Sequence, residues 1–366
     1  MNKHLIALAV AAATLSGAAS AATVYSDDTS SLSVGGRIEA TGVLQQQADS
    51  NKDNADPTKV KASNEVVDMS RARVNIGAKT QIADGVQGIG FFEKEFHSNT
   101  DASPAGRGAD ETRYVYAGVN SDQYGQLVYG KADGSLGMLT DFTDIMAYAG
   151  SVVGGTKLDV ADRTNNNLAY AGTFGDLTFK ANYVFAGSAY NKQTHEKTDI
   201  HGFSTGAVYK VADTGLALGL GYGEQRGQIK NEKGYIISDS HNDRAEQTFA
   251  VASYTMGDLY FGGLYKYGRR DALSNDDKLT DSQGYEFAAA YTMGKTVFTT
   301  TYGFMKDEKA HNEYDELANA VSVDGTYYFN SNFRTYASYT FNMLDKNKVG
   351  KVAASDQFVL GARYDF

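Results

Sequence analysis

The sequence predicts an all-β fold, a 16-stranded antiparallel transmembrane β-barrel with short turns at one rim and long external loops at the other. Three observations predict it: segments of alternating polarity recur along the chain, their connections alternate in length, and a secretory leader precedes them. Side chains of a strand alternate between two faces, so each segment presents one apolar and one polar face. In lipid only a closed sheet leaves no backbone group without a partner.

Residues 1–21 have the features of a signal peptide. Lys3 supplies the positive charge, residues 5–15 the apolar stretch, and Ala19-Ser20-Ala21 the small-residue cleavage site before Ala22. A transmembrane anchor, the alternative, needs roughly 18 or more apolar residues, and this run is shorter. We therefore expect a leader at 1–21 and a single barrel domain at 22–366.

The strands that follow number sixteen, and single-chain bacterial barrels have an even number. Each is close to the roughly 9–11 residues that cross a bilayer at a tilt. In chain order they are expected at 31–44, 68–82, 86–96, 111–120, 125–131, 164–173, 177–186, 201–211, 215–225, 246–256, 259–268, 283–293, 296–306, 317–329, 333–343 and 355–366.

The connections support the same architecture. Short ones, such as Gly175-Asp176, Gly257-Asp258 and Gly294-Lys295, suit tight hairpins. Long polar ones, such as 45–67 and 226–245, alternate with them. Short turns on one rim and long loops on the other are typical of outer-membrane barrels.

The last strand shows the alternation most clearly. Phe358, Leu360, Ala362, Tyr364 and Phe366 fall on one face, and Val359, Gly361, Arg363 and Asp365 on the other. Strand 177–186 repeats the pattern, with apolar residues at every second position. A soluble sandwich would explain one such strand, but it explains sixteen of them poorly.

Composition excludes several classes of function. The chain has no cysteine, which removes disulfides, thiolate nucleophiles and thiolate metal sites. Its net charge is -10, or -11 without Lys3, which argues against nucleic acid as a partner. The same balance hints at a channel interior that favours cations.

Arginines mark the polar face of the early strands. An arginine facing lipid at the midplane costs roughly 2–4 kcal/mol, so these side chains are expected to face the lumen. Ion pairs at the rim are the alternative for any one of them. The candidates are Arg37 with Glu39, Arg71 and Arg73, Glu93, Arg113, and Arg163 at the start of the sixth strand.

The connection at about 132–163 differs from the other long ones because it is apolar and glycine-bearing. Long loops of this kind are usually functional. Folding inside the barrel would bury its apolar residues, Leu136, Met138, Leu139, Phe142, Ile145 and Met146. Asp141 and Asp144 would then face the arginines across a narrowed passage, and the field between them would filter ions. A solvent-exposed loop with a short helix is the alternative.

Several motifs resemble the trimeric general porins of the Gram-negative outer membrane, in particular the Vibrio outer membrane protein U type, over essentially the whole chain. They are Ser33-Val34-Gly35-Gly36-Arg37, Arg71-Ala72-Arg73-Val74, the runs 112–118, 129–131 and 140–144, Val160-Ala161-Asp162-Arg163, Thr326-Tyr327-Tyr328-Phe329 and Arg363-Tyr364-Asp365-Phe366.

The resemblance implies a homotrimer of barrels whose third loop folds inward, and a water-filled channel for passive diffusion of small hydrophilic solutes and ions. It implies a basic row at Arg37, Arg73, Arg113 and Arg163, with an acidic site at Asp144. Phe366 matches the family's signal to the outer-membrane assembly machinery, and outer-membrane lipid and lipopolysaccharide are the implied surroundings. Enteric relatives have Pro-Glu-Phe-Gly-Gly where this chain has residues 147–151, so Tyr148 replaces their glutamate and the acidic side is weaker.

Two other functions are alternatives to a mildly cation-selective diffusion pore. A channel specific for oligosaccharides or a nutrient would line its passage with aromatic residues, and 25 tyrosines are available. An outer-membrane enzyme would need a nucleophile with an organised base, and no such grouping of the 6 histidines is evident. No cofactor is expected, and the acidic pairs Asp276-Asp277 and Asp307-Glu308 are better explained as solvated loops than as metal sites.

Overall fold

The computed structural model describes residues 21–48, 58, 60–98, 110–186, 188–191, 196–231, 244–271, 280–308 and 314–366. Among them nineteen strands form one continuous antiparallel sheet. Sixteen are wall strands, because β1, β3 and β10 only extend the pairing of longer neighbours. The leader expected at 1–21 lies outside the described residues except for Ala21, as does Asp276-Asp277.

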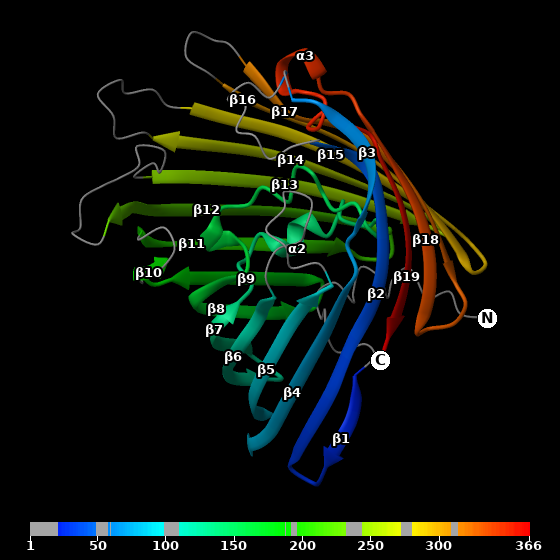
Figure 1. Cartoon of the computed structure of the whole chain (residues 1–366). Coiled ribbons are helices and arrows are strands. Elements are labelled where there is room, and N and C mark those ends of the chain that lie inside the picture. Colours follow the sequence, from blue (N-terminus) through cyan, green and yellow to red (C-terminus); the bar gives the residue numbers. More distant parts are fainter. Residues whose placement is uncertain are drawn as a thin grey trace.

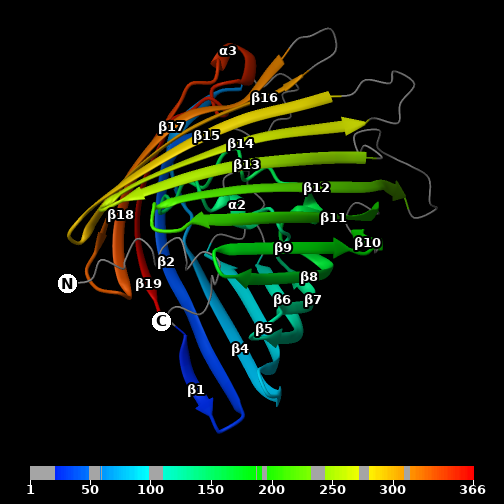
Figure 2. The same cartoon turned by 180° about the vertical axis from the view of Figure 1, so that it is seen from behind.

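The wall strands follow one another around the barrel in chain order (Figures 1 and 2). They are β2 (Ser30–Ala48), β4 (Arg71–Ala83), β5 (Val86–His97), β6 (Glu111–Ser121), β7 (Gly125–Ala132), β8 (Thr164–Phe174), β9 (Leu177–Val184), β11 (Glu196–Val211), β12 (Leu216–Asn231), β13 (Arg244–Met256), β14 (Leu259–Asp271), β15 (Thr280–Met293), β16 (Thr296–Glu308), β17 (Tyr314–Tyr328), β18 (Phe333–Asn342) and β19 (Gln357–Asp365).

All sixteen predicted strands are present, and several extend further towards the long connections. Short elements complete the chain: β1 (Ala22–Ser26), β3 (Ala62–Asp68), β10 (Ser188–Asn191), α2 (Gly137–Thr140), the 3-10 turn η2 (Asp159–Ala161) and α3 (Lys346–Val349). The part of the chain that the structure covers holds no helix long and apolar enough to cross a membrane.

Strand pairing closes the sheet into a barrel. β19 pairs with β2, so the last strand completes the ring begun by the first wall strand. Beyond this ladder, the backbone N–H of Gly36 donates to the carbonyl of Phe366 at 2.9 Å, and the N–H of Phe366 donates to Gly36 at 3.0 Å. A Cβ at position 36 would lie 2.2 Å from the carbonyl oxygen of Arg73. It would also lie 2.8 Å from Cζ of Phe366, so glycine allows both β4 and the C-terminal residue to pack closely against β2.

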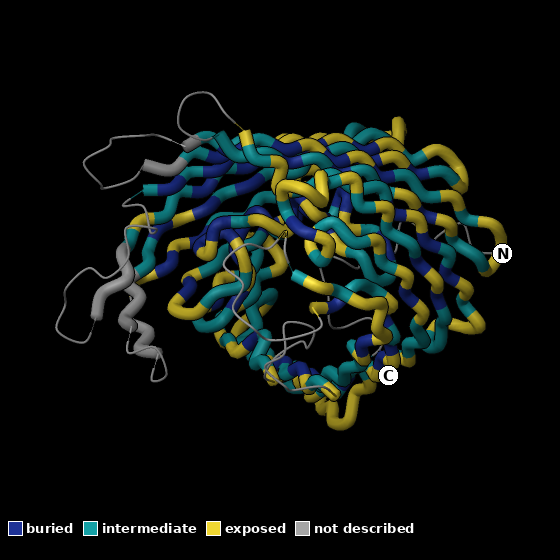
Figure 3. The backbone as a smooth tube through the Cα atoms, turned by 45° about the horizontal axis from the view of Figure 1, so that its top comes forward, coloured by how far each residue is buried: buried dark blue, intermediate teal, exposed yellow. Residues whose placement is uncertain are grey.

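The two faces of the wall differ as the alternation predicted. Phe287 is 58% exposed on the outside, whereas the adjacent Glu286 is 1% exposed on the inside. Leu360 and Val359 show the same contrast, at 55% and 1%. Buried, half-exposed and exposed residues alternate along the strands in Figure 3. Because the outer face is apolar over the whole ring, its natural surrounding is lipid.

Candidate functional site

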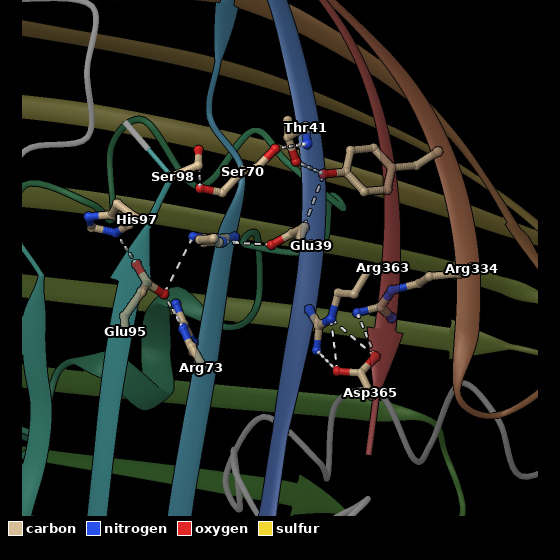
Figure 4. Close-up of polar contacts among 12 residues, drawn as sticks. Glu39, Thr41, Ser70, Arg73, Glu95, His97, Ser98, Arg334, Arg363 and Asp365 are labelled. Carbon is tan, nitrogen blue, oxygen red and sulfur yellow. Dashed lines mark hydrogen bonds and ion pairs between the residues drawn. The ribbon is translucent and has the colours of Figure 1, made fainter. Parts of the chain in front are cut away.

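The inner face of β2, β4, β5 and β6 carries a wall of arginines and glutamates. Figure 4 shows part of it, with Glu39 of β2, Arg73 of β4 and Glu95 of β5. The sequence-predicted Arg37 and Glu39 come from β2, Arg71 and Arg73 from β4, and Glu93 from β5. Arg113 lies on β6, and Arg163 immediately precedes β8. The structure thus brings the whole predicted basic row onto one side of the lumen.

Glutamates of neighbouring strands pair with these arginines. Arg71 Nε lies 2.6 Å from Glu39 Oε2, and Arg113 Nε lies 2.8 Å from Glu93 Oε1. Arg73 pairs with Glu95. Such charge-assisted bonds hold guanidinium groups in fixed orientations. The basic row is therefore extensively neutralised by its own wall.

Three further contacts extend this network. Arg163 Nη2 lies 3.1 Å from Glu111 Oε1, which also pairs with Lys131 at 3.3 Å. His97 Nε2 lies 2.9 Å from Glu95 Oε1. Glu95, Glu111 and His97 were not among the predicted site residues.

A second basic group adjoins the first across the seam. Arg363 on β19 donates from Nε to Asp365 Oδ1 at 2.8 Å, and Arg334 on β18 lies 3.9 Å from the same carboxylate. In the strand register, Arg37 stands opposite Arg73 on one side and Asp365 on the other. The arginine wall therefore runs continuously from β18 to β8.

The connection between β7 and β8 runs inside the barrel along the opposite wall, and α2 lies within the ring of strands (Figure 1). Leu136 and Leu139 are fully buried, as are Val153 and Val160. With Met138 and Phe142 they form one apolar cluster with inward residues of β9, β13, β14 and β16, among them Phe249 and Met305. Burying a large apolar side chain contributes roughly 1.5–3 kcal/mol, so this packing holds the loop against the wall.

Hydrogen bonds fix both halves of the loop. At its start, the Ser135 N–H donates to Asn182 Oδ1 at 3.0 Å and to Ser204 Oγ at 2.9 Å. Further along, the Val153 N–H donates to Glu286 Oε2 at 2.9 Å. These buried partners come from β9, β11 and β15, so the loop is attached at several points around the wall.

Inward-facing glycines provide room for the loop. A Cβ on Gly262 would lie 2.0 Å from the carbonyl oxygen of Phe142, and one on Gly221 would lie 2.5 Å from Leu139 Cδ1. Real Cβ atoms do not approach other atoms so closely, so the loop can lie here only against glycine. Gly206, Gly219, Gly284 and Gly303 likewise face loop side chains.

The far end of the loop reaches the barrel seam. Ala147 and Tyr148 pack against a small cluster of Val43, Val359 and Tyr336. Tyr148, which the resemblance implied would replace a glutamate, therefore contributes apolar contact at this position. Tyr336 in turn donates to Glu39 Oε1 at 3.0 Å and so joins the loop to the arginine wall.

The loop acids do not pair with the arginine wall. Among the described residues, the acid partners of Arg71, Arg73, Arg113 and Arg163 come from β2, β5 and β6. Asp144 is exposed and Asp141 is half-exposed on the loop. Lys180 and Lys157 are the cations that act on Asp141. The arginine wall is thus ion-paired except at Arg37, which has no ion-pair partner among the described residues, and on the loop side Asp141 and Asp144 are likewise outside ion pairs.

One sequence-based assignment was wrong. Simple alternation from Arg37, Arg73 and Arg113 predicts that the small residues Gly36, Ala40, Ala72, Ala78 and Gly118 all face lipid, where they would suit a subunit contact. Gly118, however, lies on the inward face. The register pairs Glu93 with Tyr114 and Lys94 with Thr112, which leaves Arg113 in a bulge. The bulge shifts the alternation by one residue, so Tyr114, Tyr116 and Gly118 follow the inward phase.

Comparison with known proteins decides the family. The Gram-negative porin family matches residues 7–347. The chain belongs to this family. The porin is 56% identical to porin-like protein L of Photobacterium profundum and 40% identical to outer membrane protein U of Vibrio parahaemolyticus, each over 100% of both chains.

Solved porin structures share the fold of this porin. The structure described as Salmonella typhi OmpF complex with daunomycin superposes with a TM-score of 0.74 at 19% identity, over 94% of this chain and 100% of that one. A Vibrio cholerae OmpT structure described as the trimer form gives 0.65 at 19% identity, over 93% and 100%. The protein is therefore an outer-membrane porin with a sixteen-stranded barrel.

Proposed function

We propose that this porin is a water-filled channel for passive diffusion of small hydrophilic solutes and ions. The observation that carries the proposal is the inner surface: a wall of paired arginines and glutamates faces an inward-folded loop that bears unpaired carboxylates. Charged side chains on the inside of a transmembrane barrel require water around them. The paired wall and the loop together narrow the passage.

In this proposal Arg37, Arg73, Arg113 and Arg163 form the basic side of the constriction. Asp141 and Asp144 form the acidic side, and Tyr148 fixes the end of the loop. Glu39, Arg71 and Glu93 set the charge and position of the basic side through their ion pairs. The proposal assigns no catalytic residue and no cofactor.

We expect a mild preference for cations. Wall glutamates offset most of the arginine charge, whereas the Asp144 carboxylate on the loop is exposed and carries no ion pair in the part of the chain described. The fold alone does not determine the sign, since a porin from Comamonas acidovorans with a TM-score of 0.66 is described as anion-selective. Selectivity therefore follows from the side chains of the lumen.

The test is a planar bilayer with a potassium chloride gradient across it. The purified porin should insert in steps of fixed conductance, with a reversal potential on the cation side. Neutralising Asp144 with Asp144→Asn should move that potential towards the anion side. A wild-type potential on the anion side would refute the predicted preference, and a protein that never conducts would refute the channel.

The cation preference should also depend on pH. Burial raises the pKa of Asp141 to about 7, against the opposing effect of Lys180, and Asp144 raises it further. Below this pH the group is neutral, and above it the group adds a negative charge to the passage. Reversal potentials recorded from pH 5 to 9 should become more cation-selective through about pH 7. The Asp141→Asn variant should show a weaker pH dependence, and an unchanged profile would contradict this role for Asp141.

We further propose that three copies assemble in the outer membrane after removal of the leader. The outer face carries a hollow that crosses β16–β19 and β2–β3 and is lined by small residues, among them Ala40, Gly42, Gly325, Ala337 and Ala362. Small residues let neighbouring backbones approach closely in lipid. Phe366, paired with Gly36 at the seam, is proposed as the signal that the assembly machinery binds.

Filling the hollow should weaken the trimer. Ala40→Trp places a large ring where close approach is needed, whereas Leu218→Trp changes an outward residue of β12, outside this hollow. Native electrophoresis and mass measurement in detergent should show monomers for the first variant and trimers for the second. Equal amounts of trimer in both would exclude this surface as the subunit contact.

A further inference from the structure

An aromatic cluster lies on the inner face of β5 and β6, beside the arginine wall. Phe91 and Tyr116 are directly opposite in the register, and their ring centroids lie 5.6 Å apart with an angle of 31° between the planes. Tyr114 meets Phe91 edge-on at 5.8 Å. Because Glu93 pairs with Tyr114 in the same phase, all three rings point into the lumen.

Two of these rings are half-exposed, unlike the inward-facing aromatic residues that the loop covers. Phe249 and Tyr260 also point inward, but they are buried beneath the loop, and Tyr336 is buried at the loop's far end. Phe91 and Tyr116 keep part of their surface open. Stacking a second ring on an apolar ring that contacts water removes apolar surface from water, which favours binding.

An acidic group stands next to the rings. Asp133, the first residue of the loop, is exposed and accepts a hydrogen bond from Tyr114 Oη at its Oδ1 atom, at 2.8 Å. Asp133 and Glu93 both lie close enough to Tyr116 to interact with it electrostatically. In the described part of the chain, no donor bonds to the second oxygen of Asp133, and no cation pairs with it.

The charges around the rings favour a cation. Arg113 is held by Glu93, and both Arg163 and Lys131 are held by Glu111. Arg163 also lies over the ring of Tyr114, with its guanidinium carbon 5.4 Å from the centroid. These cations are therefore engaged, whereas the carboxylate of Asp133 remains open for a positive group.

We propose that Phe91, Tyr116 and Asp133 form a binding site for solutes that join an aromatic ring to a protonated amine. The ring stacks on Phe91 and Tyr116, and the ammonium group pairs with Asp133. The site lies beside the arginine wall, so an occupant obstructs the passage of ions. The inference rests on the proposed channel function and names a class of solute that the channel retains.

The experiment compares three probes on the reconstituted porin at neutral pH. Phenethylamine carries the ring and the amine, butylamine only the amine, and 3-phenylpropionate the ring with a carboxylate. Phenethylamine should reduce the ion current reversibly, at concentrations about three- to tenfold lower than either other probe. Equal block by butylamine, or stronger block by 3-phenylpropionate, would overturn the proposal.

Variants locate the site. Phe91→Leu, Tyr116→Leu and Asp133→Asn should each raise the half-blocking concentration of phenethylamine by about three- to tenfold. The control, Phe92→Leu, alters the adjacent outward residue and should leave block unchanged. Block that persists in the Phe91 and Tyr116 variants would overturn the proposal.

Conductance without probe distinguishes loss of the binding site from loss of the channel. Each variant is first compared with the wild type in the absence of probe, and unchanged conductance shows that the channel is intact. Regular conductance steps without amine block would remove the binding site and leave the channel. The absence of any steps would remove the channel itself.

Discussion

Replacing Gly262 with valine should open the channel. Its Cβ would lie 2.0 Å from the carbonyl oxygen of Phe142, a backbone atom that cannot turn aside, so the loop must leave the wall. The hydrogen bond from Tyr260 to the same oxygen, at 2.8 Å, would be lost as well. Overpacking of this kind typically costs about 1–3 kcal/mol. Single-channel conductance should rise, and liposomes should admit larger sugars than with the wild type.

The adjacent glycine provides the control. A Cβ on Gly263 would meet only the ring of Phe287, at 3.7 Å, which is ordinary contact on the outer face. Gly263→Val should therefore leave conductance and the sugar cut-off unchanged. If both variants conduct alike, the loop does not restrict the channel at Phe142.

The second large effect concerns the two faces of β5. Phe92 points outward and is 36% exposed, and Phe91 points inward. An arginine on the lipid face at the midplane costs roughly 2–4 kcal/mol, whereas one in the lumen remains hydrated. Phe92→Arg should thus lower the free energy of unfolding well below that of Phe91→Arg, measured by denaturant titration in lipid vesicles. Equal losses, or a larger loss for Phe91→Arg, would contradict the assigned faces.

The architecture was predictable because a strand's alternation is local. All sixteen wall strands were expected near their observed positions, and the apolar character of residues 136–146 indicated a loop that needs cover. The predicted strand ends were less accurate than the strand positions. The strands extend beyond the membrane, and there the polarity of their side chains no longer alternates. The sequence did not predict β1. This short strand pairs with β2 directly beyond the segment of β2 that pairs with β19, so it only lengthens that ladder.

The site was predictable only in part, because its chemistry depends on register. A hairpin turn fixes the pairing of its strands, but a bulge between Gln81 and Ala83 shifts the register beyond the turn at Asp84-Gly85. The turn alone therefore does not reveal that Arg73 stands opposite Glu95. The pair of Arg113 and Glu93 could not be found in this way either, because it spans the bulge that also reversed the face of Gly118.

Contacts between segments that are distant in the chain could not be predicted from the sequence. Nothing in the pattern of Gly221 or Gly262 shows that a loop from another part of the chain will lie against them. Likewise, the partnership of Ser135 with Asn182 and Ser204 depends on the path of the loop across the wall. Glycines on the inward phase of neighbouring strands are the signal to look for in related chains.

The central claim is that water and ions pass inside the barrel, between the loop and the arginine wall. Because the chain has no cysteine, each introduced cysteine is unique. The decisive measurement is the ion current of Arg37→Cys, Asp144→Cys, Leu220→Cys and Leu360→Cys porins during addition of a charged, water-soluble thiol reagent. The current should fall for the first two variants and stay constant for the two outward positions. Constant current at both inward positions, or an equal fall at all four, would contradict the claim.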